Sequence, residues 1–325
     1  MKGSTKVITG LLVIGGLVCV PWIVKNPYYL HIIIMSGIFV LLASSMNLIT
    51  GCTGRLNLGH AAFYGIGAYG STLVVMKLGF PVWFGMVMGG LITVFFGVLI
   101  GIPCLKLKGS YLAITTLAFG EITRLAMINF VPLTNGPLGI RGIPGPPAIV
   151  FGRTTLISFE SKTSYYYLIL VLCVLCLLII RRVLNSQIGR TFMAIREDEV
   201  RAETVGIDTI QVKIMNFALG AFFAGIAGSF YAHYVRFISP DTFTLGETFT
   251  MLTMVVIGGL GTFYGPIIGG VIFTFLPELL RAIAEYRMIL YGLMMSVAII
   301  FMPDGIIGLL QSWITGRTNK GDKAT

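Results

Sequence analysis

The sequence predicts an all-α protein, a polytopic bundle of about ten (eight to ten) membrane-spanning helices. Of its 325 residues, 56% are hydrophobic and 11% are charged, whereas soluble domains average about 25% charged residues. The apolar residues form long unbroken runs, not the alternating segments of a membrane β-barrel. Ten helices of about 20 apolar residues each would take about 200 residues of the chain. This composition excludes a soluble enzyme and a disordered chain.

Ten apolar runs are the candidate spans. The first follows Lys2 and Lys6 and has no small-residue cleavage site before Lys25, so we expect a retained span and not a cleaved signal peptide. We expect residues 1–310 to form one transmembrane domain and residues 311–325 a short cytoplasmic tail. The runs are 7–24, 30–49, 59–76, 82–102, 111–130, 166–181, 211–233, 247–260, 264–280 and 288–302.

The Lys and Arg residues predict the orientation of the bundle. With an even number of spans and a cytoplasmic amino terminus, more of them fall in inner loops than in outer ones, which is the usual bias of membrane proteins. Both termini are therefore expected in the cytoplasm. The net charge of +10 then reports orientation, and no nucleic-acid partner is expected.

Two loops differ from the rest of the chain. The outer loop, about 131–165, is rich in proline and glycine and cannot be helical throughout. In the inner loop, about 182–212, seven of the fourteen residues 190–203 are charged. We expect one short cytoplasmic helix there.

That inner helix has further sequence signals. Gly189 precedes it, Gly206 suits its end, and Glu197 stands four residues before Arg201, a favourable ion-pair spacing. Its apolar face is predicted to consist of Phe192, Ile195 and Ala202.

Motifs of soluble enzymes and metal sites have simpler explanations here. Gly65-x-Gly67-x-x-Gly70 matches a dinucleotide fingerprint, but it lies in an apolar run with no preceding strand, so close helix packing explains it. The histidines stand far apart and lack acidic neighbours, and Cys173-x-x-Cys176 lies within an apolar run. No metal site, catalytic residue or phosphate-binding loop is expected.

Polar residues within apolar runs are candidates for function, because they are costly to place in lipid. Glu121 and Arg124 share a helix face; they either neutralise each other in a packed contact or line a translocation path. We include them among five candidate path residues, Asn57, His60, Tyr64, Glu121 and Arg124.

Glycines predict two broken or re-entrant segments, near 51–59 and 258–270. Non-helical backbone at membrane depth is tolerated only where it faces protein or a watery cavity. The glycines expected at these breaks, or packing beside them, are Gly51, Gly54, Gly59, Gly258, Gly259, Gly261 and Gly265.

Five motifs in order resemble the LivM-type permeases of bacterial branched-chain amino acid ABC importers. The inner GRTFMAIREDE (189–199), followed by GI (206–207), is the most recognisable. The resemblance covers roughly residues 40–310. The other motifs are NLITGCTGRLNLGHAAFYGIGAY (47–69), SYLAITTLAFGEI (110–122), TNGPLGI with GIP (134–140 and 142–144) and GGLGTFYGP (258–266).

The resemblance implies a transport subunit, not an enzyme, in the bacterial inner membrane. It would pair with a LivH-type permease, two ATPase subunits and a periplasmic substrate-binding protein. ATP and Mg²⁺ would bind the ATPase subunits, and this chain would bind no cofactor. The inner helix would be the coupling helix, although Ala-Glu replaces the usual Glu-Ala-Ala, so the region is carried over and not each contact. The matched positions are Gly189, Arg190, Ala194, Arg196, Glu197, Asp198, Glu199, Ala202, Glu203, Gly206 and Ile207.

Other functions stay open. An ion-coupled secondary transporter holds its ion site within the bilayer, and Asn57, His60 and Glu121 are suitable residues for such a site. The cargo is also open: branched-chain amino acids are the family's usual substrates, but relatives carry other amino acids, amides or urea.

Overall fold

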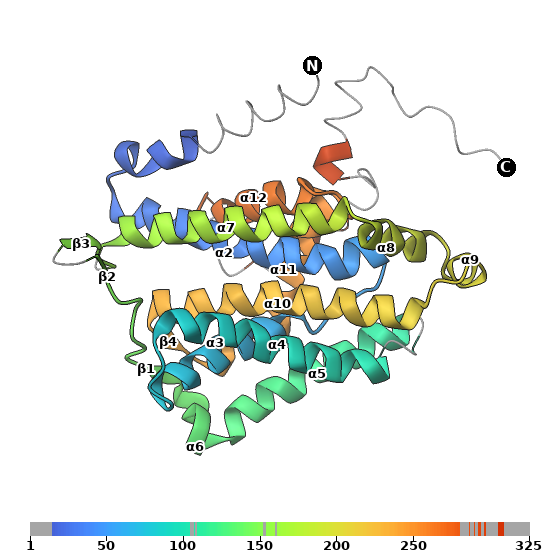
Figure 1. The fold of residues 1–325 in the computed structure, drawn as a ribbon, viewed down its shortest axis with the longest axis horizontal. Helices are drawn as coiled ribbons and strands as arrows, with labels where there is room; N and C mark the ends of the chain where they lie inside the picture. Colours follow the sequence, from blue (N-terminus) through green and yellow to red (C-terminus); the bar gives the residue numbers. More distant parts are fainter. Residues whose placement is uncertain are drawn as a thin grey trace.

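The computed structural model describes residues 15–104, 107, 109–151, 154–159 and 161–279, together with 286, 289, 292, 293, 296 and 305–308. Within these residues the protein is a helical bundle (Figure 1). Its long helices are α2 (Pro27–Met46), α3 (His60–Met76), α4 (Val82–Cys104), α5 (Ser110–Asn129), α7 (Lys162–Leu184), α10 (Thr209–Val235), α11 (Leu245–Gly258) and α12 (Gly265–Leu279).

These helices coincide with eight of the ten predicted spans. Residues 15–23 are also helical, but the rest of the predicted span 7–24 and most of 288–302 lie outside the described residues, as does the predicted tail. Five segments, including α2 with the turn that extends it to Gly51, are long and apolar enough to cross a membrane. The protein is therefore a multi-pass helical membrane protein; ten spans and cytoplasmic termini stay predictions.

Helix α10 lies at the centre of the bundle. It packs against α3 and α4 on one side and against α2 on the other, and α2 also packs against α7 and α12 (Figure 1). Small residues allow this close approach: a Cβ on Gly67 of α3 would collide with the backbone of Gly225 in α10. The glycine fingerprint at 65–70 therefore serves helix packing, as predicted.

The two ends of the bundle carry different short elements (Figure 1). At one end lie α8 (Gln187–Glu197) and α9 (Glu199–Thr204). The other end holds the proline-rich segment between α5 and α7, with α6 (Val131–Thr134) and four short strands. Strand β1 (Ile140–Arg141) pairs antiparallel with β4 (Phe237–Ile238), and β2 (Ile149–Phe151) pairs with β3 (Thr154–Ile157).

Two breaks interrupt the helices at the α8–α9 end. Helix α2 ends in a π-helical turn, Asn47–Gly51, and residues 54–59 are not helical before α3 begins at His60. The second break, residues 259–264, separates α11 from α12. Both lie within the predicted segments near 51–59 and 258–270, although residues 265–270 of the second segment belong to α12. A π-turn inside a helix commonly marks a functional site.

Candidate functional site

The chain between α7 and α10 forms two helices, so the prediction of one helix over 190–203 is wrong. The backbone at Asp198 is extended (φ −158°, ψ 107°), which ends α8 and begins α9. The Asp198 carboxylate accepts a hydrogen bond from the backbone N–H of Arg201 at 3.1 Å and pairs with its guanidinium at 2.9 Å. Arg201 therefore pairs with Asp198 and not with Glu197.

The other sequence predictions for this segment are confirmed only in part. Gly189 lies within α8, which begins after the capping residue Ser186. Gly206, with φ of 88°, follows the end of α9 as predicted. The predicted apolar face is confirmed, since Phe192, Ile195 and Ala202 are all buried. Contacts with α7 and α10 hold the two short helices on the bundle.

Arg196 of α8 reaches both helix breaks. Its Nη1 donates a hydrogen bond to the carbonyl oxygen of Gly51 at 2.7 Å. The side chain then passes Gly54 and Gly261, where an added Cβ would press on Arg196 Cγ or collide with its guanidinium. Gly51 lies at the first break and Gly261 in the second. One side chain of α8 is thus in contact with both breaks.

Asn47 joins the two breaks directly. Its Nδ2 donates to the carbonyl of Thr262 at 2.8 Å, and its Oδ1 accepts from the backbone N–H of Gly261 at 2.8 Å. Asn47 also begins the π-turn that closes α2. The two breaks are therefore one hydrogen-bonded unit, although more than 200 residues separate them in sequence.

Glu199 at the start of α9 makes a second connection to the bundle. Its carboxylate accepts hydrogen bonds from Arg55 in the first break and from Lys213 in the first turns of α10. The Lys213 side chain is only 2% exposed, so its charge depends on this partner. Nearby, Asn216 donates to the carbonyl of Leu48 at 2.7 Å and to Thr53 at 3.2 Å.

We call Asn47, Arg55, Arg196, Glu199 and Lys213 the α8–α9 junction. Arg196 and Glu199 are among the site residues predicted from the sequence, whereas the other three and Asn216 are not. Asn47, Lys213 and Asn216 are polar residues in apolar segments, and their burial cost was the signal that should have identified them.

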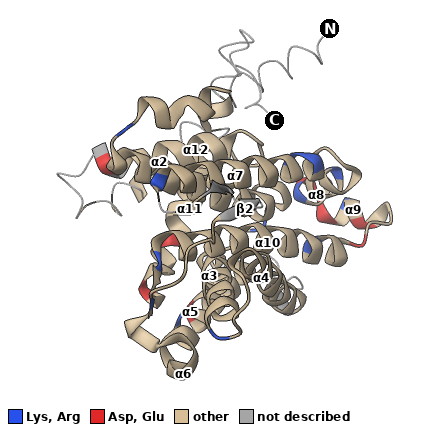
Figure 2. Ribbon diagram, turned by 60° about the vertical axis from the view of Figure 1, so that its left-hand side comes forward, with Lys and Arg blue, Asp and Glu red and all other residues tan. Residues whose placement is uncertain are grey.

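The face of α8 and α9 that points away from the bundle is charged and partly apolar. Figure 2 shows the charged residues gathered at the two ends of the bundle, densely over α8 and α9. Ala194 and Ile207 are half-buried, and Gly206 is exposed. The exposed side chains of this outward face are Arg190, Glu197, Arg201 and Glu203, with the apolar Val200 and Val205.

The five predicted path residues fall into two groups. Asn57, His60 and Tyr64 are buried inside the bundle. The imidazole of His60 lies 2.8 Å from Ser45 Oγ and 3.3 Å from Asn57 Nδ2, and Tyr64 packs against Tyr231. These three side chains therefore make their contacts with other residues inside the bundle.

Glu121 and Arg124 form the second group, on the partly exposed face of α5. They make an ion pair with an N–O distance of 2.5 Å, and Arg124 lies 3.7 Å from Asp241. The side chain of Glu121 is 45% exposed. The predicted Glu121–Arg124 ion pair is therefore present, but it is partly exposed and is not buried between packed helices.

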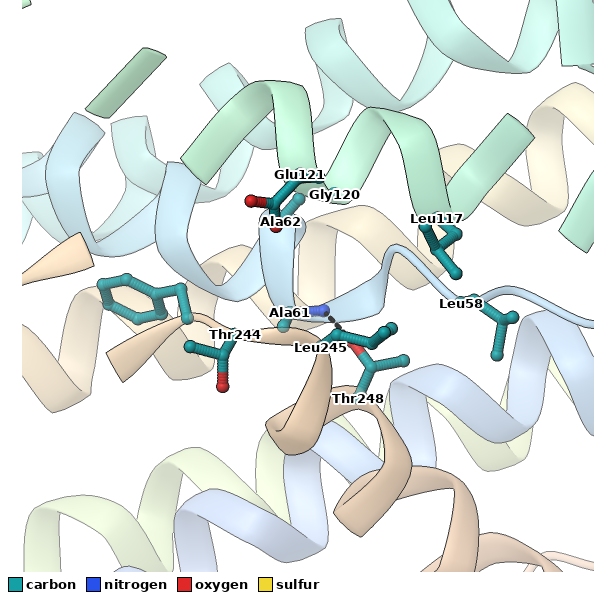
Figure 3. Close-up of a pocket in the computed structure, with 10 residues that line it drawn as sticks. Leu58, Ala61, Ala62, Leu117, Gly120, Glu121, Thr244, Leu245 and Thr248 are labelled. Carbon is teal, nitrogen blue, oxygen red and sulfur yellow. Dashed lines mark hydrogen bonds between the residues drawn. The ribbon is translucent and has the colours of Figure 1, made fainter. Parts of the chain in front are cut away.

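Glu121 borders a cavity of about 270 Å³ between α3, α5 and the start of α11. Figure 3 shows Glu121 and Gly120 on one side, with Ala61 and Thr248 on the other; the N–H of Ala61 donates to Thr248 Oγ1 at 3.1 Å. The remaining wall is mostly apolar. Such a cavity can hold an aliphatic group beside a charged pair. Its other lining residues are Leu58, Leu117, Phe243, Thr244 and Leu245.

Comparisons with known proteins agree with this architecture. Residues 28–299 match the family model described as branched-chain amino acid transport system / permease component. The chain is 34% identical to the high-affinity branched-chain amino acid transport system permease protein LivM of Salmonella typhimurium, across 89% of this chain and 73% of that protein. The LivM protein of Escherichia coli shows the same identity and coverage.

A second kind of permease protein is also similar. The permease protein LivH of Escherichia coli is 26% identical, across 84% of this chain and 92% of that protein. No solved structure matches the fold. The family model covers most of the chain, and the protein therefore belongs to the family of branched-chain amino acid transport system permease components.

Proposed function

We propose that this chain is the transmembrane permease subunit of an ABC importer that carries branched-chain amino acids into the cell. It would work in the bacterial inner membrane beside a LivH-type second permease. Two ATPase subunits would bind ATP and Mg²⁺ on the inner side, and α8 and α9 of this chain would sit in a groove of the ATPase. A periplasmic binding protein would dock at the opposite end of the bundle. The similarity to both LivM and LivH proteins supports a paired permease.

The α8–α9 junction is the observation that carries this proposal. The outward face of α8 and α9 offers charges and two exposed valines to a partner, while Arg196 and Glu199 hold the two helices to the helix breaks. When the ATPase subunits close, they would move α8 and α9 as a body. Because Arg196 contacts both breaks and Asn47 joins them, that movement would shift the two breaks together, and with them the adjoining ends of α2, α3, α11 and α12.

The cavity beside Glu121 is the proposed part of the translocation path on this chain. Its small and apolar wall suits an aliphatic side chain, and the Glu121–Arg124 pair offers one charge of each sign to a zwitterion. Helix α5, which borders this cavity, also exposes the apolar residues Ile114, Ile122 and Leu125, which a second permease would cover.

Uptake by the complete importer in proteoliposomes tests the proposal. We expect leucine uptake to need ATP and the loaded binding protein, and to continue when a protonophore removes the proton gradient. Uptake that stops with the protonophore at constant ATP would instead identify an ion-coupled transporter. A preference for urea or acetamide over leucine would change the proposed cargo.

Arg196→Gln separates coupling from assembly in the same assay. The variant keeps the outward face but loses the charged hydrogen bond to Gly51, so we expect normal co-purification with the ATPase subunits and at least a tenfold fall in uptake per ATP hydrolysed, since charged hydrogen bonds contribute about 1.5–3 kcal/mol. The matched control is Arg182→Gln, an exposed arginine in the last turn of α7 that lies outside the outward face of α8 and α9. Unchanged coupling in Arg196→Gln would contradict the proposed role.

A further inference from the structure

A second cavity lies at the end of the bundle opposite α8 and α9. It has a volume of about 370 Å³ and is formed where α2 and α7 begin and α10 ends. None of its residues takes part in the junction or the cavity beside Glu121. We call it the helix-end pocket; it is lined by His31, Lys162, Tyr165, Tyr234, Val235 and Arg236.

Cationic side chains from different helices converge on the helix-end pocket. Lys162 is the first residue of α7, and Arg236 directly follows α10. His31 of α2 adds an imidazole to the lining of the pocket. Among the residues that the structure describes, no carboxylate lies within ion-pair distance of Lys162 or Arg236. The pocket therefore offers two positive charges to an anion.

Hydrogen bonds hold these groups in place without an anion. Arg236 Nη2 donates to the Tyr165 hydroxyl at 3.4 Å, and that hydroxyl donates to the carbonyl of His233 at 3.4 Å. In the same pocket, His31 Nδ1 lies 2.6 Å from the Tyr234 hydroxyl. These contacts use only part of the donor capacity of the guanidinium, which has five N–H groups.

The backbone of Arg236 indicates that its side chain is needed there. Arg236 ends α10 in the left-handed conformation, with φ of 61°. Glycine is the usual residue at this position, because any Cβ is strained in that conformation. An arginine at such a position favours a role for the guanidinium itself.

The surroundings of the pocket indicate where the anion comes from. Lys162 Nζ donates to the carbonyl of Pro27 at 3.1 Å, which places the pocket beside the start of α2. The segment of the chain around the start of α2 exposes Trp22, Ile23 and Tyr29. Exposed aromatic residues at the ends of spans are typical of the headgroup region of a bilayer. A lipid phosphate lies at the same depth.

We propose that the helix-end pocket binds the phosphate of an anionic phospholipid. Lys162 and Arg236 neutralise the phosphate charge, and the Tyr234 hydroxyl and His31 border it. The acyl chains follow the exposed apolar face of α7, which includes Val171, Leu175 and Leu178. This site is independent of the cargo and of the ATPase contacts.

Native mass spectrometry of the purified full-length chain tests the site. Detergent-solubilised protein is offered phosphatidylglycerol or phosphatidylcholine, and the retained lipid is counted. We expect preferential retention of phosphatidylglycerol. Arg236→Gly should weaken that retention about fivefold, since one basic residue near a membrane surface contributes about 1 kcal/mol of attraction to anionic lipid. Lys162→Gln should have an effect of similar size.

The glycine variant also removes the backbone strain, so its thermal unfolding midpoint should equal or exceed that of the parent. The matched control is Arg141→Gln, a basic residue at the same end whose guanidinium stacks on Phe237 outside the pocket; it should retain phosphatidylglycerol normally. Equal retention of the two lipids, or unchanged retention by Arg236→Gly, would overturn the proposal. Arginine-dependent binding of inorganic phosphate without any lipid preference would reject the lipid and assign the pocket to free phosphate.

Discussion

Lys213 carries a charge at a site that is almost fully closed to solvent, and this sets the energetics of the α8–α9 junction. Its ammonium pairs with Glu199, which also accepts from Arg55. A buried ion pair contributes little by itself, but removing one partner leaves a charge without compensation. The junction should therefore respond differently to loss of the anion and loss of the cation.

Glu199→Gln should destabilise the protein by about 3 kcal/mol, because it leaves Lys213 buried beside a neutral amide and close to Arg55. Lys213→Met should cost less, since Arg55 still pairs with Glu199. The double variant should recover much of the loss. Thermal unfolding of the purified variants in detergent measures this cycle. A double variant as unstable as the sum of the single variants would show that the pair is not coupled.

Gly261 permits a contact that any side chain would prevent. Its φ is 75°, and an added Cβ would collide with the Arg196 guanidinium. Gly79 has nearly the same φ, 73°, but open space around it. Alanine at either position should cost about 1 kcal/mol of backbone strain. Only Gly261→Ala should also displace Arg196 and reduce uptake per ATP hydrolysed. Equal uptake by the two variants would mean that strain alone acts at position 261.

At the scale of whole elements, the helices and the two breaks were predictable, but the contacts between distant segments were not. A long apolar run in a membrane must satisfy its own backbone hydrogen bonds. Helices α2 to α5 could therefore be located from the apolar runs along the sequence. The antiparallel pairing of Ile140 with Ile238 depends on contacts between distant residues. So does the orientation of Arg196 and Glu199 toward the bundle, which their local sequence does not reveal.

The division of the inner segment into α8 and α9 shows a second limit. Helix propensity and ion-pair spacing favoured one helix over 190–203. Asp198 can also cap a new helix, and its carboxylate accepts from the backbone of Arg201. Burial of Phe192, Ile195 and Ala202 against the bundle favours the bent arrangement. Tertiary packing therefore decided between two locally acceptable structures.

The outward face of α8 and α9 should carry the ATPase contact. Val200 is 61% exposed and Val205 is 76% exposed, which is unusual for apolar residues between charged neighbours. Replacing both with Glu should abolish co-purification with the ATPase subunits, because an interface core tolerates unpaired charge poorly. Leu138→Glu, a 69% exposed position in the segment at the opposite end, is the control. Normal ATPase recovery with the valine variant would place the contact elsewhere.

At the scale of the whole molecule, the bundle has the charged face of α8 and α9 at one end and a cavity between α3, α5 and α11. The junction ties α8 and α9 to both helix breaks, and the cavity beside Glu121 lies between α3, which follows the first break, and α11, which precedes the second. A movement of the breaks would therefore change the cavity. This geometry predicts that the cavity can be blocked without disturbing assembly.

Leu245→Trp tests that separation of roles. Leu245 lines the cavity and is 37% exposed, so a larger ring can fill the space without entering the core. We expect leucine uptake to fall by at least tenfold, while ATPase recovery and the unfolding midpoint stay near those of the parent, since surface substitutions usually change stability by about 0.5 kcal/mol or less. Phe249→Trp is the matched control, because Phe249 is 41% exposed on the same helix but does not line the cavity. If both variants transport normally, the path does not pass through this cavity; if both fail, the loss reflects the surface of α11 and not the cavity.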